Sequence, residues 1–229
     1  MIPALPFPSV EVEWKPAYRI TPTRFPTIYL FDRVASPSDF EALYALEAMT
    51  NPRLREETGD LSMVAPEERR YGPGSGPIMA AFTHLNPMGS RFSNGEYGVF
   101  YAGKERETVI AETRFHSEIF LQATNEAPTR LQMRLYFVTI KGEVIDLRNA
   151  DRDNPDLLNP SSYAASRQIG QTIRQAGANG LVYCSVRKQN GECVAVFRPR
   201  ILSDCIHAAH FEYHWNGKEI DYITQQIAA

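Results

Sequence analysis

Arg91, Tyr101, Glu112 and Ser185 have residue types and surroundings that are suited to chemistry. Arg91 precedes a glycine-punctuated turn, Tyr101 ends a short apolar strand, and Glu112 lies inside the next predicted helix. A planar guanidinium makes paired hydrogen bonds to phosphate oxygens, an aromatic ring stacks on a flat ring, and a carboxylate orients hydroxyls or stabilises positive charge. Ser185 ends a later apolar strand but has no Gly-x-Ser-x-Gly elbow around it, so it suits hydrogen bonding better than nucleophilic attack.

Each of these residues also has a purely structural interpretation. An arginine in a loop is commonly solvated or ion-paired, and a tyrosine in an apolar strand is commonly a core residue with a bonded hydroxyl. Glu112 lies four residues before His116, a spacing that produces ordinary contacts on a helix surface. Ser185 has the alternative of an ordinary strand hydroxyl. The order of the residues along the chain, more than any one of them, favours a functional site.

The elements expected to position these residues are strands joined by hairpins, with helices between them. Strands are predicted at 18–20, 27–31, 97–102, 131–140, 143–147, 180–186, 192–198, 211–215 and 219–223, and helices at 36–50, 78–85, 108–123 and 160–176. Lys141-Gly142 and Asn216-Gly217 are expected to form hairpin turns. This pattern predicts an α+β fold rather than a doubly wound one.

The composition indicates one domain, 18–229, preceded by an N-terminal arm, 1–17, because no shift in composition marks a linker. The arm is apolar but interrupted by prolines and has no basic start, so it is typical of neither a signal peptide nor a membrane span. We therefore expect a cytoplasmic protein without membrane contact. The net formal charge of -3 argues against nucleic acid as a direct partner. Residues 1–16 and the irregular connection 53–77 are candidate contacts for a partner or acceptor protein.

No metal site is expected. The three cysteines have no CxxC spacing and are expected to be buried, reduced thiols. The histidines at 207, 210 and 214 fall in a segment that alternates like a strand instead of lining one helix face. The glycine-rich stretch 72–77 follows no apolar strand and precedes no Lys-Ser/Thr pair, so it is interpreted as a plain loop.

The order of the candidate residues resembles the RES family, which is named for an arginine, a glutamate and a serine. The resemblance covers most of 18–200 and is densest at 90–116 and 180–199. Tyr18-Arg19-Ile20 looks like the family's opening arginine strand, and Arg24-Phe25-Pro26 like the start of a longer subgroup. The chain departs from the family's usual Gly-Arg-Trp-Asn, because Ser90-Arg91-Phe92-Ser93 stands in its place and Phe92 replaces the indole.

The resemblance implies a fold like that of ADP-ribosyltransferases, with a split, mostly antiparallel sheet and flanking helices. It implies NAD⁺ as the substrate and no metal. The resemblance implies that Arg91 binds pyrophosphate together with Arg19 or Arg24, of which Arg19 is favoured. It implies that Tyr101 packs on nicotinamide and that Glu112 contacts the ribose. Ser185 is implied to support the nicotinamide side.

The resemblance further implies a toxin of a type II toxin–antitoxin system that cleaves the nicotinamide–ribose bond and transfers ADP-ribose to a protein. The subgroup that the chain resembles includes a member that modifies an enzyme of nucleotide metabolism. Water or phosphate as acceptor would make it an NAD⁺ glycohydrolase or NAD⁺ phosphorylase instead. The implied partner is a helix-turn-helix (Xre-type) antitoxin. A non-catalytic nucleotide-binding or docking module is a further alternative, which Glu112 disfavours because binding alone needs no carboxylate beside the ribose.

Overall fold

The computed structural model describes residues 6–23, 32, 36–50, 58–150 and 154–226. Its strands are β1 (Ser9–Pro22), β2 (Phe100–Gly103), β3 (Thr129–Asp146), β4 (Gly180–Cys184), β5 (Glu192–Val196), β6 (Leu202–Trp215) and β7 (Ile220–Gln226). Its α-helices are α1 (Pro37–Thr50), α3 (Ser75–Thr83), α4 (Arg106–Ala123) and α5 (Ala164–Gln175). Short 3-10 helices are η2 (Leu61–Met63), η3 (Pro66–Glu68), η4 (Pro155–Leu158) and η5 (Pro199–Ile201).

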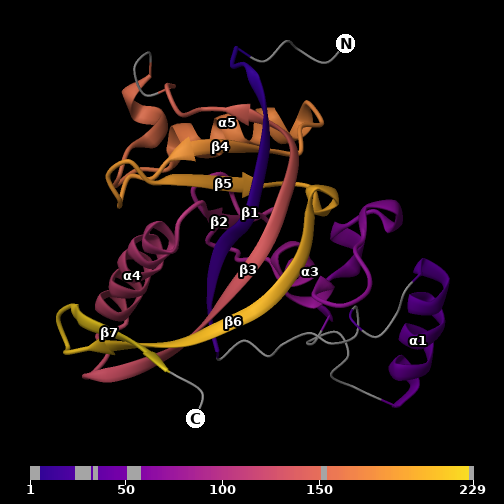
Figure 1. Cartoon of the computed structure of the whole chain (residues 1–229), viewed down its shortest axis with the longest axis horizontal. Coiled ribbons are helices and arrows are strands. Elements are labelled where there is room, and N and C mark those ends of the chain that lie inside the picture. The colour runs from indigo at the N-terminus through magenta and orange to yellow at the C-terminus, as the bar shows by residue number, and fades with distance from the viewer. Residues whose placement is uncertain (1–5, 24–31, 33–35, 51–57, 151–153, 227–229) are drawn as a thin grey trace.

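The strands pair in the order β1-β2-β5-β4-β3-β6-β7, and β1 also pairs with β3. These pairings are antiparallel except that of β3 with β4. In Figure 1, β4 and β5 run across the direction of β1 and β3. The sheet therefore has two portions, joined where β4 meets the end of β3 and where β2 meets β1. The predicted α+β fold with a split, mostly antiparallel sheet and flanking helices is confirmed.

Successive side chains on β2, β4 and β5 enter two different cores, because side chains alternate between the faces of a strand. Phe100, Val182 and Val194 belong to a cluster that includes Phe40, Met79 and Tyr136. Tyr101, Tyr183 and Cys193 belong to a second cluster, together with Phe92, Leu147 and Ile173. The Tyr101 ring and the Phe100 ring consequently lie on opposite faces of β2.

The hairpin predicted across Lys141-Gly142 is wrong, because β3 runs unbroken through both residues. On β1, Glu13 pairs with Lys141 and Val12 with Gly142, so one long partner strand keeps this segment extended. A Cβ at position 142 would lie 2.6 Å from Cγ2 of Ile201. The glycine at this position therefore permits close packing and does not mark a turn.

The N-terminal boundary also differs from the prediction. β1 begins at Ser9, and Val12, Trp14 and Ala17 are buried in the first core cluster. Residues 9–17, which were expected to belong to an arm, are thus part of the sheet. The strand predicted at 27–31 lies outside the described residues.

The predicted start of α1 is confirmed, since the backbone N–H of Asp39 donates to Oγ of Ser36 over 3.2 Å. Helix α3 begins at Ser75, earlier than the expected Ile78, so the loop interpretation of 72–77 is wrong for its last three residues. Oδ1 of Asp32 accepts the N–H of Gly76 at 2.6 Å and supplies a partner in the first helical turn. A residue distant in sequence thus stabilises the early start.

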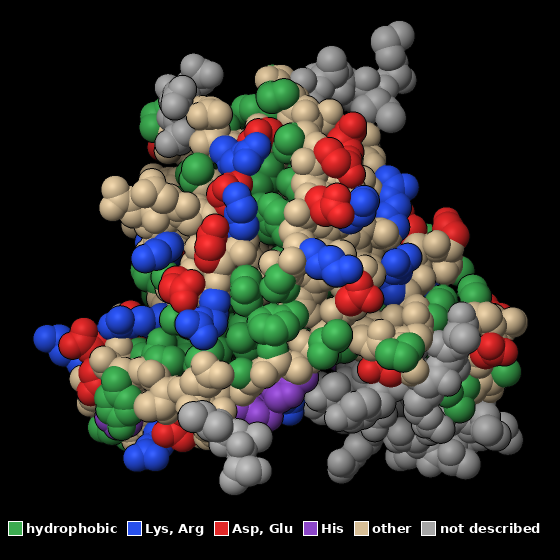
Figure 2. Space-filling view, in the orientation of Figure 1, with side chains coloured by type: hydrophobic (Ala, Val, Ile, Leu, Met, Phe, Trp, Pro, Cys, Tyr) green, Lys and Arg blue, Asp and Glu red, His purple; other side chains and the backbone are tan. Residues whose placement is uncertain are grey.

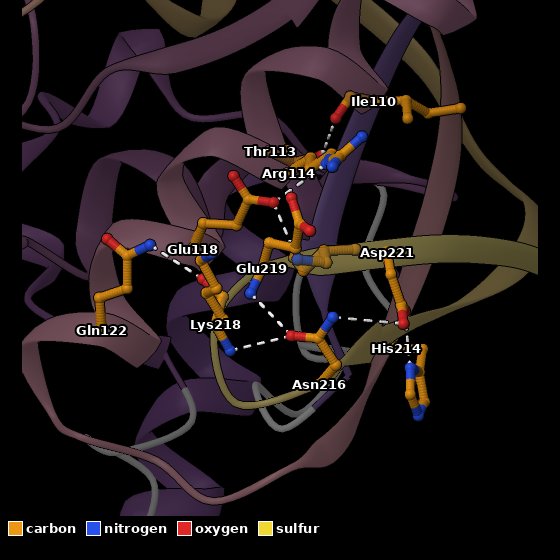
Figure 3. A network of polar contacts seen from close by, with 11 residues as sticks. Ile110, Thr113, Arg114, Glu118, Gln122, His214, Asn216, Lys218, Glu219 and Asp221 are labelled. Atoms are coloured by element: carbon orange, nitrogen blue, oxygen red, sulfur yellow. Dashed lines mark hydrogen bonds and ion pairs between the residues drawn. The ribbon is translucent and has the colours of Figure 1, made fainter.

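Helix α4 is fixed against the hairpin formed by β6 and β7, the hairpin predicted around Asn216-Gly217 (Figure 3). Oε1 of Glu118 accepts both Nε of Arg114 at 3.1 Å and the backbone N–H of Ile220 at 2.9 Å. One turn later, Nε2 of Gln122 donates to the carbonyl of Lys218 at 3.1 Å. These contacts hold the helix that carries Glu112.

Charged side chains of both signs are interspersed over the face of the molecule in Figure 2, which shows no broad basic area. No disulfide joins the three cysteines, all of which the structure describes; Cys193 and Cys205 are buried and Cys184 is partly buried. Over the described residues, no helix combines the length and the apolar content needed to cross a bilayer.

Candidate functional site

Glu112 and Ser185 meet where α4 passes the end of β4. Oγ of Ser185 donates to Oε1 of Glu112 at 2.6 Å, and the Glu112 side chain is 15% exposed. The same Oγ accepts the backbone N–H groups of Arg187 at 3.1 Å and Lys188 at 3.0 Å. The hydroxyl is therefore oriented by the turn after β4, and it in turn orients the carboxylate.

Arg91 is buried, with 6% of the residue exposed. Its Nη1 donates to the carbonyl of Asn159 at 2.9 Å, and its Cζ lies 4.4 Å from the centroid of the Tyr163 ring. Its Nη2 is buried and has no hydrogen-bond partner within the described part of the chain. A buried guanidinium N–H without a partner is unfavourable and is commonly reserved for a ligand.

Tyr101 holds the turn that carries Arg91. Its hydroxyl lies 2.7 Å from Oγ of Ser90 and accepts the backbone N–H of Phe92 at 3.0 Å, on either side of the arginine. Burial raises the pKa of Tyr101 to about 12, so the phenol stays protonated at neutral pH. The tyrosine thus positions Arg91 in addition to its predicted role as an aromatic surface.

Tyr183 on β4 is buried, its ring lies 4.9 Å from that of Phe92, and Tyr101 packs against the same core cluster. The pKa of Tyr183 is raised first by burial and further by Glu112 and Tyr101, while the positive charge of Arg91 opposes the rise. The structure therefore brings Glu112 and Ser185 into hydrogen-bond contact, and it places Arg91 in the turn that the Tyr101 hydroxyl holds.

Arg19 does not join this group. Its Cζ lies 4.3 Å from the centroid of the Phe100 ring, on the opposite face of β2 from the Tyr101 ring. Its Nη1 donates to the backbone carbonyl of Tyr101 at 2.9 Å, and burial lowers its pKa. Arg19 therefore braces β2 from behind. Arg24, the alternative pyrophosphate ligand, lies outside the described residues.

Arg187 and His116 are site residues that were not predicted. Cζ of Arg187 lies 3.2 Å from the centroid of the Phe115 ring, and its Nη2 donates to the carbonyl of Pro160. Nε2 of His116 lies 3.9 Å from Oε2 of Glu112. The sequence signal for Arg187 was its place two residues after Ser185, but nothing in that spacing showed where its guanidinium would point.

The site is electropositive around the carboxylate. The pKa of His116 is lowered by partial desolvation and by the positive charges of Arg187 and Arg91, although 52% of its side chain is exposed. The imidazole is consequently neutral at neutral pH. Burial raises the pKa of Cys193, so this neighbouring thiol is protonated and not a nucleophile.

Among the described residues, no group of three or more His, Cys, Asp or Glu side chains is placed to hold a metal ion. The strand predicted at 211–215 is confirmed, and β6 extends back to Leu202, so positions 207, 210 and 214 all lie on this strand. A cavity of about 480 Å³ lies apart from the site, between α1 and η2, and is lined by Phe40, Tyr44 and Arg69 among others.

The α+β fold thus carries a buried arginine, Arg91, and a serine-bound carboxylate, Glu112. The chain belongs to the RES domain family, whose model matches residues 67–216. It is 32% identical over 206 residues to the "Uncharacterized protein y4oC" of Sinorhizobium fredii (strain NBRC 101917 / NGR234), which is 90% of this chain and 85% of that relative.

Among solved structures, the chain is similar to one described as the crystal structure of the M. tuberculosis MbcT-MbcA toxin-antitoxin complex. The TM-score is 0.48 at 11% sequence identity, over 87% of this chain and 86% of that chain. The family assignment rests on the family model and the sequence relative.

Proposed function

We propose that this protein is an NAD⁺-consuming toxin of a type II toxin–antitoxin system, which cleaves the nicotinamide–ribose bond and transfers ADP-ribose to a protein acceptor. The observation that carries the proposal is the Ser185-oriented carboxylate of Glu112, 2.6 Å from the serine hydroxyl, in an electropositive site. Membership of the RES family supports it, because the family's known toxins consume NAD⁺.

The reaction places positive charge on the ribose ring as the carbon–nitrogen bond breaks, and the bonding electron pair leaves with neutral nicotinamide. A carboxylate beside the ribose orients its hydroxyls and stabilises this oxocarbenium-like centre. Ser185 keeps Glu112 in one position, so little reorganisation is needed when the charge develops. An acceptor oxygen or nitrogen then attacks the ribose carbon and loses its proton.

The remaining residues bind the substrate in this proposal. The unpartnered Nη2 of Arg91 is available for a phosphate oxygen, and its guanidinium stays charged at any physiological pH. Tyr101 offers a partly buried aromatic ring with a neutral hydroxyl, so no negative charge competes with the phosphates. Burying a ring face against the nicotinamide would stabilise binding without a further polar group.

The proposed partner is an antitoxin of the helix-turn-helix, Xre type, and the proposed compartment is the cytoplasm. Known toxins of the RES family are paired with antitoxins. This pairing supports both the proposed antitoxin partner and the proposed compartment. Co-expression with the neighbouring reading frame, followed by co-purification and growth measurement, tests the pairing.

The test of the enzyme is nicotinamide release from NAD⁺ by wild type, Glu112→Gln and the control Glu107→Gln. Glu107 is on the same helix but largely exposed, with 57% of its side chain accessible. We expect Glu112→Gln to lower the rate about 100- to 1000-fold, as for the loss of a preorganised electrostatic contact, and Glu107→Gln to leave it unchanged. Circular dichroism establishes that both variants fold.

The acceptor is identified by repeating the assay with inorganic phosphate and with cell lysate. Labelled protein supports transfer to protein, ADP-ribose identifies water as the acceptor, and its 1-phosphate identifies phosphate. Absence of nicotinamide release from folded wild type under all three conditions would contradict the enzyme and favour a non-catalytic binding module.

A further inference from the structure

Two arginines from separate segments bind consecutive backbone carbonyls. Nη1 of Arg91, before β2, donates to the carbonyl of Asn159 at 2.9 Å, and Nη2 of Arg187, after β4, donates to that of Pro160. Consecutive residues are about 3.8 Å apart between Cα atoms. Both guanidinium groups therefore contact one short segment, although the two residues are distant in sequence, and both act electrostatically on His116.

Neither charge is neutralised. In the part of the chain that the structure describes, no ion pair joins Arg91 or Arg187 to a carboxylate. Each guanidinium lies on an aromatic ring, and each keeps a buried N–H without a partner there, Nη2 of Arg91 and Nε of Arg187. Arg91 is buried and Arg187 is partly buried, and like charges that act on one site are unfavourable unless an anion joins them.

The same turn connects this pair to the carboxylate. The backbone N–H groups of Arg187 and Lys188 donate to Oγ of Ser185, and Ser185 donates to Glu112. An anion held by the two arginines would thus lie beside the ribose-facing group of the proposed mechanism. Both arginines lower the pKa of His116, and Nε2 of His116 lies 3.9 Å from Oε2 of Glu112.

We infer that Arg91 and Arg187 together bind one phosphate group, and that Arg187, in place of Arg19, is the second arginine at the phosphate. The planar fork of each guanidinium matches phosphate oxygens, and the carbonyls of Asn159 and Pro160 hold both forks in place before the ligand arrives. The inference rests on the proposed function only for the source of the phosphate, which is either the diphosphate of NAD⁺ or inorganic phosphate acting as acceptor.

The experiment is a calorimetric titration of wild type, Arg187→Met and the control Arg114→Met with pyrophosphate, inorganic phosphate, NAD⁺ and nicotinamide riboside. Arg114 is a fair control because it lies on α4 next to Phe115 but pairs with Glu118 at 3.1 Å. We expect Arg187→Met to bind pyrophosphate and NAD⁺ about 10- to 100-fold more weakly and to bind nicotinamide riboside as wild type does. Arg114→Met should match wild type with all four ligands.

Titrations with phosphate and NAD⁺ together distinguish the diphosphate of NAD⁺ from inorganic phosphate as the source of the bound phosphate group. Phosphate that competes with NAD⁺ identifies the diphosphate subsite, and phosphate that binds beside NAD⁺ identifies an acceptor subsite; either outcome supports the paired-arginine site. Pyrophosphate affinity unchanged in folded Arg187→Met would overturn it, as would an equal loss of nicotinamide riboside, which is the mark of a purely structural role.

Arg187→Lys provides a second variant that keeps the charge and removes the fork, in case Arg187→Met does not fold. We expect about tenfold weaker pyrophosphate binding, and wild-type affinity would count against the inference. The pyrophosphate arm does not depend on NAD⁺ chemistry. If wild type releases no nicotinamide but Arg187→Met loses pyrophosphate binding, the proposed enzyme activity is contradicted and the phosphate site is supported.

Discussion

Arg148 and the Arg91–Arg187 pair are buried or partly buried arginines in adjacent regions. They differ in their hydrogen-bond partners. Arg148 donates from Nε and Nη2 to Asp146 at 2.9 and 2.7 Å, and from Nη1 to Glu192 at 2.9 Å. Glu192 also binds Nζ of Lys104 at 2.6 Å. The site arginines instead bind neutral carbonyls and keep unpartnered N–H groups.

The difference separates charge that stabilises the fold from charge that is available to a ligand. Hydrogen bonds from Arg148 lower the pKa of Asp146, and Lys104 and Arg148 lower that of Glu192 against the opposing effect of its burial. Yet the two regions nearly touch, because Sγ of Cys184, next to Ser185, donates to the carbonyl of Arg148 at 3.3 Å. An arginine close to the site is therefore not necessarily available to bind a ligand. Its availability depends on whether its guanidinium is already paired with carboxylates.

The largest contrast is expected in activity. Arg91→Met should lower kcat/KM for NAD⁺ about 100-fold, because a charge-assisted contact to phosphate is lost. Its stability should stay the same or rise, since an uncompensated buried charge is removed. Nicotinamide release and urea denaturation measure the two effects. A strongly destabilised Arg91→Met with normal kcat/KM would break the comparison.

Arg148→Met is expected to show the reverse pattern. The loss of two carboxylate partners should lower the free energy of unfolding by about 2 kcal/mol at pH 7, while activity per folded molecule is retained. Because the folded-state pKa values of Asp146 and Glu192 are depressed, their stabilisation is present above about pH 5 and is lost as pH falls below about 4. Denaturation of both proteins across that range should therefore converge at low pH; a constant gap would contradict the ion-pair account.

The smallest expected effect is on His116. Its imidazole should titrate with a pKa of about 4 in the free protein and with a higher pKa when pyrophosphate neutralises Arg91 and Arg187. NMR titration of the imidazole measures the shift, with His214, which pairs with Asp221, as an internal control. No shift with saturating pyrophosphate would place the anion elsewhere.

Much of the fold was predictable because local patterns agree with their surroundings. The capping serine at 36, the glycine after α5 and the Asn216-Gly217 turn all mark real boundaries. The failures lie where partners distant in sequence override local preference. Lys141-Gly142 resembles a turn, but β1 pairs across it, and Asp32 supplies a distant partner for the early start of α3.

The candidate site was predictable to a similar degree. Arg91, Tyr101, Glu112 and Ser185 were predicted from their residue types and their order, and the structure joins Ser185 to Glu112 and Tyr101 to the turn that carries Arg91. Arg19 was favoured because it opens a strand that resembles the family's, but the alternation along β1 and β2 directs it to the other face. Arg187 carried no comparable signal, since its position depends on the turn after β4.

The sequence by itself determined which groups are chemically capable and which segments carry them, because residue type and local periodicity are properties of short stretches of chain. Only the tertiary structure brought the guanidinium groups of Arg91 and Arg187 to one segment of the chain. This arrangement depends on the pairing of β2, β4 and β5 and on the placement of the carbonyls of Asn159 and Pro160. Contacts between distant segments fix the direction of a side chain, and no local pattern contains that information.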